Sequence, residues 1–290
     1  FHMIKTPLVS VLMTAYNREK YIASAIESVL ASTYTNFELI IVDDGSIDQT
    51  VSIARRYEEI DSRVKVYINE TNLGDYPNRN RAASLARGKY IKYLDSDDLI
   101  YPHGLAVFTE SMEKNPTAAL GISSRISLPL QPFPHLLTPR QAYHRHFFEY
   151  GLLDFGPTGV IIRRDVFLEI GCFSGKRFIG DSECWMKIAA RHPVLELPSA
   201  LIYWRRHEGQ EFQEGLGGIN GGYFIMALPM LRETFDNPNC PLNEAEKTSL
   251  LKTQYRQYGR ALIKHVLKSG QVRKSLHWAR ELKIPLTAIF

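Results

Sequence analysis

The chain has 290 residues, of which 44% are hydrophobic and 23% charged, as in a globular protein with a sizeable core. No apolar run approaches the roughly 20 residues of a membrane-spanning helix, and the first residues lack the features of a secretion signal. Three cysteines without a CxxC pair (Cys172, Cys184 and Cys240) argue against a disulfide framework or a zinc site and indicate a reducing cytosol.

Apolar runs rich in β-branched residues alternate with helical patterns over the first hundred residues. The predicted strands are 8–13, 37–42, 64–68 and 89–94, and the predicted helices are 18–31, 48–60 and 77–87. This alternation indicates right-handed βαβ units and a parallel sheet. Ligands bind such sheets in the crevice at the carboxyl ends of the strands.

Each of these four strands runs into a polar segment. The segments are 14–17, 43–46, 69–75 and 95–98. Because the carboxyl ends of parallel strands meet at one edge of the sheet, we expect the four segments to converge there.

The pattern changes after residue 124. Four prolines within 128–139 predict no regular structure there. The later elements expected are a short helix at 140–150, a strand followed by a helix across 156–167, a helix at 181–192, a strand at 200–207, a mobile glycine-rich loop at 214–223 and helices from about 225 onwards.

The formal net charge of +4 is unevenly distributed, since residues 251–283 hold nine Lys or Arg against one Glu. Five basic residues recur every four positions and fall within an arc of about 160° of one helix: Lys252, Arg256, Arg260, Lys264 and Lys268. An apolar stripe lies opposite: Leu251, Tyr255, Tyr258, Leu262 and Val266. We expect this stripe to dock on the rest of the chain, and the basic face to attract anionic lipid head groups.

Four spaced motifs carry a resemblance to a known family, within residues 9–50, 72–98, 171–189 and 203–210. With them the chain resembles the family 2 glycosyltransferases. The resemblance implies an α/β GT-A fold, with a Rossmann-like, mostly parallel sheet flanked by helices and a C-terminal helical extension. It divides the chain into a nucleotide-sugar-binding half (1–124), an acceptor-binding half (125–224) and a basic helical extension (225–290).

The stretch YLDSDD matches the metal-binding DxD element of that family. The resemblance makes Asp97 a ligand of Mn²⁺ or Mg²⁺, Asp95 a contact of the ribose or the metal, and Asp98 a supporting neighbour. A metal there would neutralise the diphosphate as it leaves the sugar. The alternative is that the three are solvated turn residues, one of them capping a helix that begins near Tyr101.

The nucleotide would be held by residues after the first two strands. The resemblance places Asp44 of VDDGS against the base ring, where it selects uracil, although the Asp-Gly pair also indicates a turn. Thr14, Ala15 and Tyr16 would line the nucleotide. Arg79 matches an Arg-Asn pair of the family and would contact the nucleotide or diphosphate, unless it is an ordinary exposed helix residue.

Asp181 is the expected catalytic base, because an inverting transfer needs a carboxylate to take the proton of the acceptor hydroxyl. In GDSECW the Asp and Trp185 match the family, whereas Gly180 stands where the family has Glu. Asp181 would otherwise only N-cap its helix. Glu183 is the alternative base.

The stretch YWRRHEGQ resembles an Arg-x-His element of the family. Arg205 and His207 would approach the diphosphate and the metal from the far side, where positive charge assists departure of the leaving group. A histidine after a strand is otherwise commonly an ordinary surface residue.

The resemblance therefore implies a metal-dependent, inverting glycosyltransferase with a donor expected to be UDP-linked, acting in surface polysaccharide or glycan biosynthesis. A glycan or lipid-linked acceptor and an anionic membrane surface are the expected partners, nucleic acid is not, and the location is cytoplasmic, at the inner face of the membrane. Two alternatives remain. A sugar nucleotidyltransferase would need a glycine-rich phosphate loop where this chain reads TAYN, and Gly180 leaves open a sugar-nucleotide-binding module without transferase activity.

Overall fold

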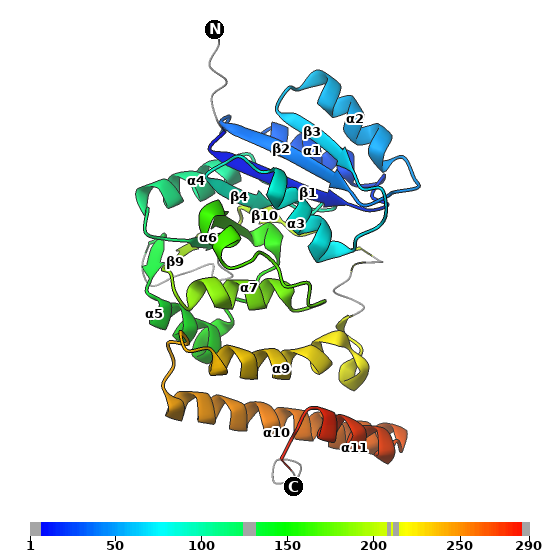
Figure 1. Cartoon of the computed structure of the whole chain (residues 1–290), viewed down its shortest axis with the longest axis vertical. Helices are drawn as coiled ribbons and strands as arrows, with labels where there is room; N and C mark the ends of the chain where they lie inside the picture. Colours follow the sequence, from blue (N-terminus) through cyan, green and yellow to red (C-terminus); the bar gives the residue numbers. More distant parts are fainter. Residues whose placement is uncertain (1–6, 124–131, 208–209, 211–214, 286–290) are drawn as a thin grey trace.

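A computed structural model of the chain describes residues 7–123, 132–207, 210 and 215–285. Within these residues, eight strands form one sheet in the order β3-β2-β1-β4-β8-β6-β9-β7 (Figure 1). The strands are β1 (Val9–Ala15), β2 (Phe37–Asp43), β3 (Val64–Ile68), β4 (Tyr90–Tyr93), β6 (Leu120–Ser123), β7 (His135–Leu137), β8 (Val160–Arg163) and β9 (Val194–Leu197).

The first half of the chain builds the parallel part of the sheet. Strands β3, β2, β1 and β4 are joined in parallel, with Val9 opposite Phe37 on one side and Tyr90 on the other. The helices of this half are α1 (Ile22–Leu30), α2 (Thr50–Ile60), α3 (Asp75–Leu85) and α4 (Gly104–Lys114). All four predicted strands and the three predicted helices are present, so the α/β interpretation is confirmed.

The second half continues the same sheet with mixed directions. Strand β8 pairs antiparallel with both β4 and β6, β9 pairs parallel with β6, and β7 pairs antiparallel with β9. Helices α5 (Pro139–His144), α6 (Arg164–Glu169) and α7 (Gly180–Ala189) and the π-helix η1 (Arg145–Tyr150) belong to this half. The first half of the sheet is therefore entirely parallel and the second half mixed. Among the described residues, four of the seven strand pairs of this sheet are parallel, as the prediction of a mostly parallel sheet requires.

Two predictions for the second half are wrong. Residues 135–137 form the outer strand β7, because Pro134 and Pro139 lie just outside it and so remove no hydrogen bond from the ladder; residues 128–131 lie outside the described residues. The strand expected at 200–207 is only β10 (Ile202–Tyr203), since its partner β5 (Leu99–Ile100) offers two residues for pairing.

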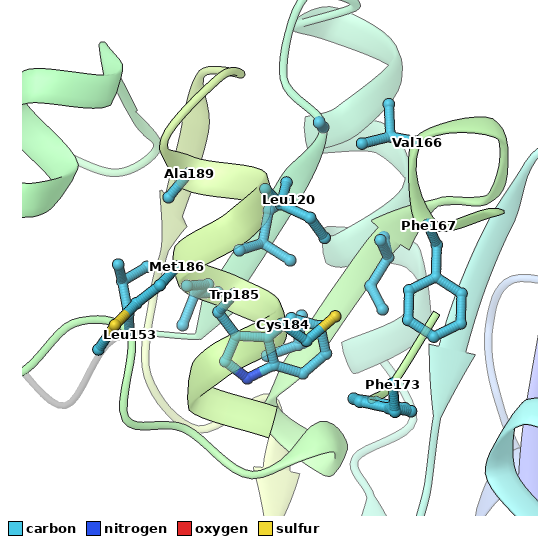
Figure 2. Close-up of a cluster of buried hydrophobic side chains, with 14 of the residues drawn as sticks. Leu120, Leu153, Val166, Phe167, Phe173, Cys184, Trp185, Met186 and Ala189 are labelled. Atoms are coloured by element: carbon cyan, nitrogen blue, oxygen red, sulfur yellow. The ribbon is translucent and has the colours of Figure 1, made fainter. Parts of the chain in front are cut away.

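Helix α7 is anchored in the core by Trp185, whose side chain is fully buried. Its indole N–H donates to the carbonyl of Phe155 at 2.7 Å, and the ring of Phe173 lies 5.7 Å away, edge-on. Figure 2 shows this cluster, in which Leu153, Met186 and Val166 also point inward. Packing at this density fixes the position of the residues at the start of α7.

The C-terminal part forms a helical layer of α9 (Gly222–Asp236), α10 (Glu244–Ser269) and α11 (Val272–Glu281). Figure 1 shows α7, α9 and α10 one below another. The ring of Tyr258 on α10 lies 4.4 Å from that of Phe224 on α9, and Leu262 is buried. The apolar stripe of α10 thus docks on the chain itself, as predicted, and its five regularly spaced basic residues are exposed.

The glycine-rich loop predicted at 214–223 lies partly outside the described residues. Its described part contains a 3-10 turn, η3 (Gly218–Asn220), and the first residues of α9. None of the helices in the described ranges is long and apolar enough to cross a membrane.

Candidate functional site

The polar segments after β1, β2 and β3 meet at one edge of the sheet, as predicted. The N–H of Asp44 donates to the carbonyl of Ala15 at 2.8 Å, and the N–H of Asn69 donates to the carbonyl of Asp43 at 2.9 Å. The N–H of Asn17 donates to the Ser46 hydroxyl at 2.8 Å. Backbone hydrogen bonds therefore hold these loops together before any ligand contributes.

Residues 14–16 end strand β1 at this edge. Thr14 is half-buried and Ala15 is buried, whereas the ring of Tyr16 is 46% exposed. The carbonyl of Tyr16 accepts a hydrogen bond from the Arg18 guanidinium at 3.1 Å. An exposed aromatic ring fixed at its backbone offers a flat apolar surface to a nucleotide.

Asp44 holds the loop that leads into α3. Its buried carboxylate accepts from the Asn69 side chain at 2.5 Å and the Leu73 N–H at 2.8 Å through Oδ1, and from the Gly74 N–H at 2.9 Å through Oδ2. A carboxylate oxygen can accept two hydrogen bonds. Since Oδ2 accepts one in the part of the chain that the structure describes, it has room for one more from a ligand. The turn after β2 is held by Asp43 instead.

Arg79 is a buried residue of α3, so its interpretation as an exposed helix residue is wrong. Its guanidinium donates to Asp75 at 2.8 Å and to Asp95 at 2.7 Å. Burial acts to lower the pKa of Arg79, but these two carboxylates raise it well above its usual value. Arg79 therefore stays charged and ties α3 to the segment after β4.

Of the carboxylates after β4, Asp97 and Asp98 are buried and Asp95 is half-buried, which contradicts their interpretation as solvated turn residues. Helix α4 begins at Gly104 after His103, without a side-chain cap, so no aspartate caps it. Oδ1 of Asp98 accepts from the Arg205 N–H at 3.0 Å, while Oδ2 is buried and has no hydrogen-bond partner among the described residues. Burial and the nearby charge of Asp95 raise the pKa of Asp98.

Asp97 meets an arginine and a histidine from distant parts of the chain. Its Oδ2 lies 3.2 Å from Nε of Arg18 and 3.0 Å from Nε2 of His207. The His207 ring stacks on Tyr21 of α1, with centroids 4.5 Å apart. His207 thus faces the Asp97 carboxylate, as the resemblance implied, and is not an ordinary surface residue.

Arg205 braces the same loop from the other side. Its Nε donates to the carbonyl of Asp97 at 2.8 Å, a terminal nitrogen donates to Ser24 at 3.2 Å, and the guanidinium lies 5.1 Å from the Tyr21 ring centroid. These contacts fix the shape of the loop around Asp97.

A divalent cation fits these side chains when a ligand supplies the rest of its coordination. No group of three or more His, Cys, Asp or Glu in the described ranges could hold a metal ion by itself. The facing pair of Asp97 and His207 nevertheless offers one oxygen and one nitrogen ligand. Mg²⁺ usually binds through one or two carboxylates, substrate phosphates and water, which is what this set allows.

Asp181 lies in the first turn of α7, inside the helix and not at the N-cap position that the alternative interpretation gave it. The helix begins at Gly180 after Ile179, which makes no side-chain cap bond. Oδ1 of Asp181 accepts from the Ser182 N–H at 2.8 Å. Burial raises the pKa of Asp181 to about 7, although the charge of Arg79 opposes the shift. A carboxylate with a pKa near 7 is well matched to general-base catalysis at neutral pH.

Glu183, the alternative base, is engaged in ion pairs. Its carboxylate lies 3.0 Å from the Lys176 ammonium and 3.1 Å from that of Lys187, and it also accepts from the Ser174 hydroxyl. Burial acts to raise the pKa of Glu183, but these partners lower it overall. Glu183 is thus a structural carboxylate, and Asp181 remains the candidate base.

Tyr76 occupies the space in which a side chain at position 180 would stand. A Cβ added to Gly180 would lie 2.8 Å from both Cε2 and Cζ of the Tyr76 ring. Because real Cβ atoms essentially never come so close to another atom, glycine is required here as long as Tyr76 is present. This contact explains why the chain departs from the family pattern at Gly180.

Four residues of the site were missed by the sequence reasoning: Arg18, Tyr76, Lys92 and Thr158. Lys92 is fully buried in β4; its ammonium donates to the carbonyls of Tyr93, at 2.7 Å, and Thr158, and burial lowers its pKa to about 7. The Thr158 hydroxyl accepts from the Asp95 N–H at 3.0 Å. A lysine inside the apolar strand KYIKYL was a signal that could have been noticed, whereas nothing in the sequence marks Tyr76.

The sequence matches the profile described as Glycosyl transferase family 2 over residues 10–171. The glycosyltransferase GlyG of Streptococcus pneumoniae serotype 4 is 35% identical over 218 residues, which cover 70% of this chain and 72% of GlyG. Three further curated relatives are 44 to 46% identical but match over only 28 to 38% of their own length.

Solved structures share the fold at low sequence identity. S. aureus TarS 1-349 in complex with UDP-GlcNAc superposes with a TM-score of 0.73 and 20% identity, covering 97% of this chain and 82% of that one. The mannosyltransferase PcManGT from Pyrobaculum calidifontis, in complex with GDP-Man and Mn²⁺, gives a TM-score of 0.66 and 15% identity, covering 98% and 86%. These likenesses confirm the predicted GT-A architecture.

Proposed function

Because the chain belongs to glycosyl transferase family 2, we propose that it is a metal-dependent, inverting transferase that moves a sugar from a UDP-linked donor to an acceptor hydroxyl. The sugar would be a hexose or an N-acetylhexosamine. The observation that carries the proposal is Asp181, a half-buried carboxylate with a pKa of about 7 at the start of α7. One such base, acting from the side opposite the leaving group, suffices for inversion.

In the proposed reaction, Asp181 accepts the proton of the acceptor hydroxyl while the oxygen attacks the anomeric carbon. The bond from that carbon to the diphosphate breaks, and its electron pair leaves with UDP. Thr14, Ala15, Tyr16 and Asp44 hold the nucleotide, and Arg79, Arg205 and Asp95 hold the ribose and diphosphate side. Asp97 and His207 would hold a divalent cation, which would supply positive charge to the departing diphosphate.

The assignment of UDP rests on the second hydrogen bond that Oδ2 of Asp44 can accept, which suits the N–H of a uracil ring. TarS, whose fold is shared, was solved with UDP-GlcNAc. A nucleotidyltransferase finds no support in the site, because residues 14–17 supply no glycine-rich phosphate loop. A binding module without catalysis finds little support either. Contact with Tyr76 accounts for the glycine at position 180, and the candidate base Asp181 is still present.

We expect Asp44→Ala to weaken UDP binding by about tenfold and to reduce the preference for UDP over GDP, because it removes a hydrogen bond to a charged acceptor. Isothermal titration calorimetry with both nucleotides measures this. Since Asp44 also holds the Leu73 and Gly74 N–H groups, thermal unfolding of the variant separates a folding defect from a binding defect. An unchanged ratio of UDP to GDP affinity would show that Asp44 does not read the base.

The acceptor is proposed to be a glycan or a lipid-linked saccharide in surface polysaccharide synthesis, reached at the inner face of the membrane. The surface that supports this lies on α10 and α11, where exposed basic residues surround exposed aliphatic ones. The basic set is Lys264, Lys268, Arg273 and Lys274, and the aliphatic set is Ile263, Leu267, Val272 and Leu276. Residues 263–276 contain no Asp or Glu. A surface of this composition suits anionic lipid better than a second copy of itself, whose like charges would repel it.

We expect reversible binding to liposomes that contain anionic lipid, little binding to neutral ones, and release at high salt, because each basic residue near such a surface contributes about 1 kcal/mol. The double variant Lys264→Glu/Lys268→Glu should lose most of the binding in a flotation assay.

The matched control is Lys65→Glu/Lys114→Glu, which changes the net charge equally at exposed positions on β3 and α4. Equal and negligible binding of the unmodified protein to both kinds of liposome would leave the basic surface without this explanation. A polyanionic acceptor would then be the next candidate.

A further inference from the structure

The start of α3 contacts the proposed site on both the nucleotide side and the base side. The N–H of Gly74, just before the helix, donates to Asp44, and Arg79 bridges Asp75 and Asp95. Two carboxylates on the nucleotide side, Asp44 and Asp95, are thus hydrogen-bonded to residues at the start of α3. Tyr76 lies between Gly74 and Arg79 in the sequence, and its side chain points toward α7 instead.

Tyr76 connects α3 to the start of α7 by three kinds of contact. Its Oη accepts the N–H of Asp181 at 3.1 Å, which is one of the helix N–H groups that lack a partner in the helix. Its ring fills the space beside Gly180, and it packs against Phe173 with centroids 5.1 Å apart. Only 7% of Tyr76 is exposed, so these contacts are made in the interior.

We propose that Tyr76 is a positioning residue for the reaction: it sets the place of the Asp181 carboxylate relative to the donor through the Tyr76–Asp181 hydrogen bond and the Tyr76–Gly180 contact. The inference rests on the proposed function, in which Asp181 is the base. It adds that the base is held from the donor side of the site by α3, and not only by the core beneath α7.

Tyr76 does not itself exchange protons in this role. Burial, together with the charges of Asp181 and Asp75, raises the pKa of Tyr76 far beyond neutral pH, so the phenol stays protonated. Its oxygen accepts the backbone N–H of Asp181, so the loss of that oxygen would leave the N–H unpaired and the backbone at the base less firmly held.

The decisive variant is Tyr76→Phe, which keeps the ring and removes Oη. We expect kcat to fall about tenfold, with an unchanged affinity for UDP and an unchanged donor KM, because one buried hydrogen bond that orients the base is lost. The assay is release of UDP from whichever donor in a panel of UDP-linked sugars the protein hydrolyses fastest, with thermal unfolding measured alongside.

A second pair of variants tests the contact at Gly180. Gly180→Ala should lower both kcat and Tm, because its methyl group meets the Tyr76 ring at 2.8 Å, whereas the same change in a Tyr76→Ala background should cost little further. A coupling of this sign in the double-mutant cycle shows that the two residues act together.

The outcomes separate this inference from the function on which it rests. If Tyr76→Phe kept the kcat of the unmodified protein while Asp181→Asn was inactive, Tyr76 would be a packing residue only. A loss confined to Tm or donor KM would overturn the inference in the same way. If Asp181→Asn kept its activity, the base would be misassigned and the role of Tyr76 would fall with it.

Discussion

Asp181→Asn is expected to reduce turnover by about 1,000-fold and to leave UDP affinity unchanged, because general-base catalysis contributes a factor of this size. The substitution preserves the shape of the side chain and the acceptor for the Ser182 N–H. Asparagine has no basicity with which to take the proton of the acceptor. Steady-state rates of UDP release, combined with calorimetric titration of UDP, measure both quantities.

The pH dependence follows from the raised pKa of about 7. The base must be ionised to act, so the rate should fall about tenfold per pH unit below 7 and level off above it. Asp154→Asn provides a matched test, because the charge of Asp154 raises the pKa of Asp181. That variant should stay active, with its acid limb moved to lower pH.

The pH dependence of stability gives an independent check of the raised pKa of Asp181. The ionised carboxylate, which the reaction needs, disfavours the folded state. A carboxyl group whose pKa is raised from 3.8 to about 7 on folding opposes folding increasingly as pH rises through this range. The asparagine side chain of the Asp181→Asn variant carries no charge at any pH. The gain in Tm of this variant over the unmodified protein should therefore grow between pH 5 and pH 8.

Asp97→Asn is expected to weaken metal-dependent UDP binding by about 100-fold, since a cation neutralising the diphosphate is worth several kcal/mol. The loss leaves Arg18 and His207 facing an uncharged amide. Calorimetry in MnCl₂ and in EDTA measures the effect: the unmodified protein should lose affinity in EDTA, and the variant should bind equally weakly in both.

Asp181→Asn is the control for this experiment, because it should retain metal-dependent binding. The reverse pattern, with binding lost at Asp181 and turnover alone lost at Asp97, would show that the two roles are exchanged. Undiminished UDP affinity in EDTA would remove the metal from the proposal altogether.

The first half of the fold could be predicted because each element is local. Hydrophobic period and β-branched runs place β1 to β4 and α1 to α3 within a few residues of their observed bounds. The convergence of the polar loops then follows from parallel pairing alone. His207 and Asp97 are 110 residues apart, and the resemblance, not any local pattern, predicted that they lie together.

The remainder depends on contacts between distant segments. Strand β7 exists because β9 offers it a partner, which no pattern within 128–139 reveals. The burial of Arg79 comes from Asp95 and the Tyr93 ring, which lie on another element. The contact between Tyr76 and Gly180 joins residues 104 positions apart with no charge or motif to mark either of them, so only coordinates show it.

The antiparallel strand β8 has a consequence for how the chain folds during synthesis. Strand β4, the last of the four consecutive parallel strands, pairs with β1 on one side and with β8 on the other, and β6 needs β8 as well. Until residues 160–163 have left the ribosome, β4 presents an open edge, with the ammonium of Lys92 lacking its Thr158 partner. A nascent chain that ends near residue 124 would therefore be prone to pair with other chains, and the protein should not be divided at this point.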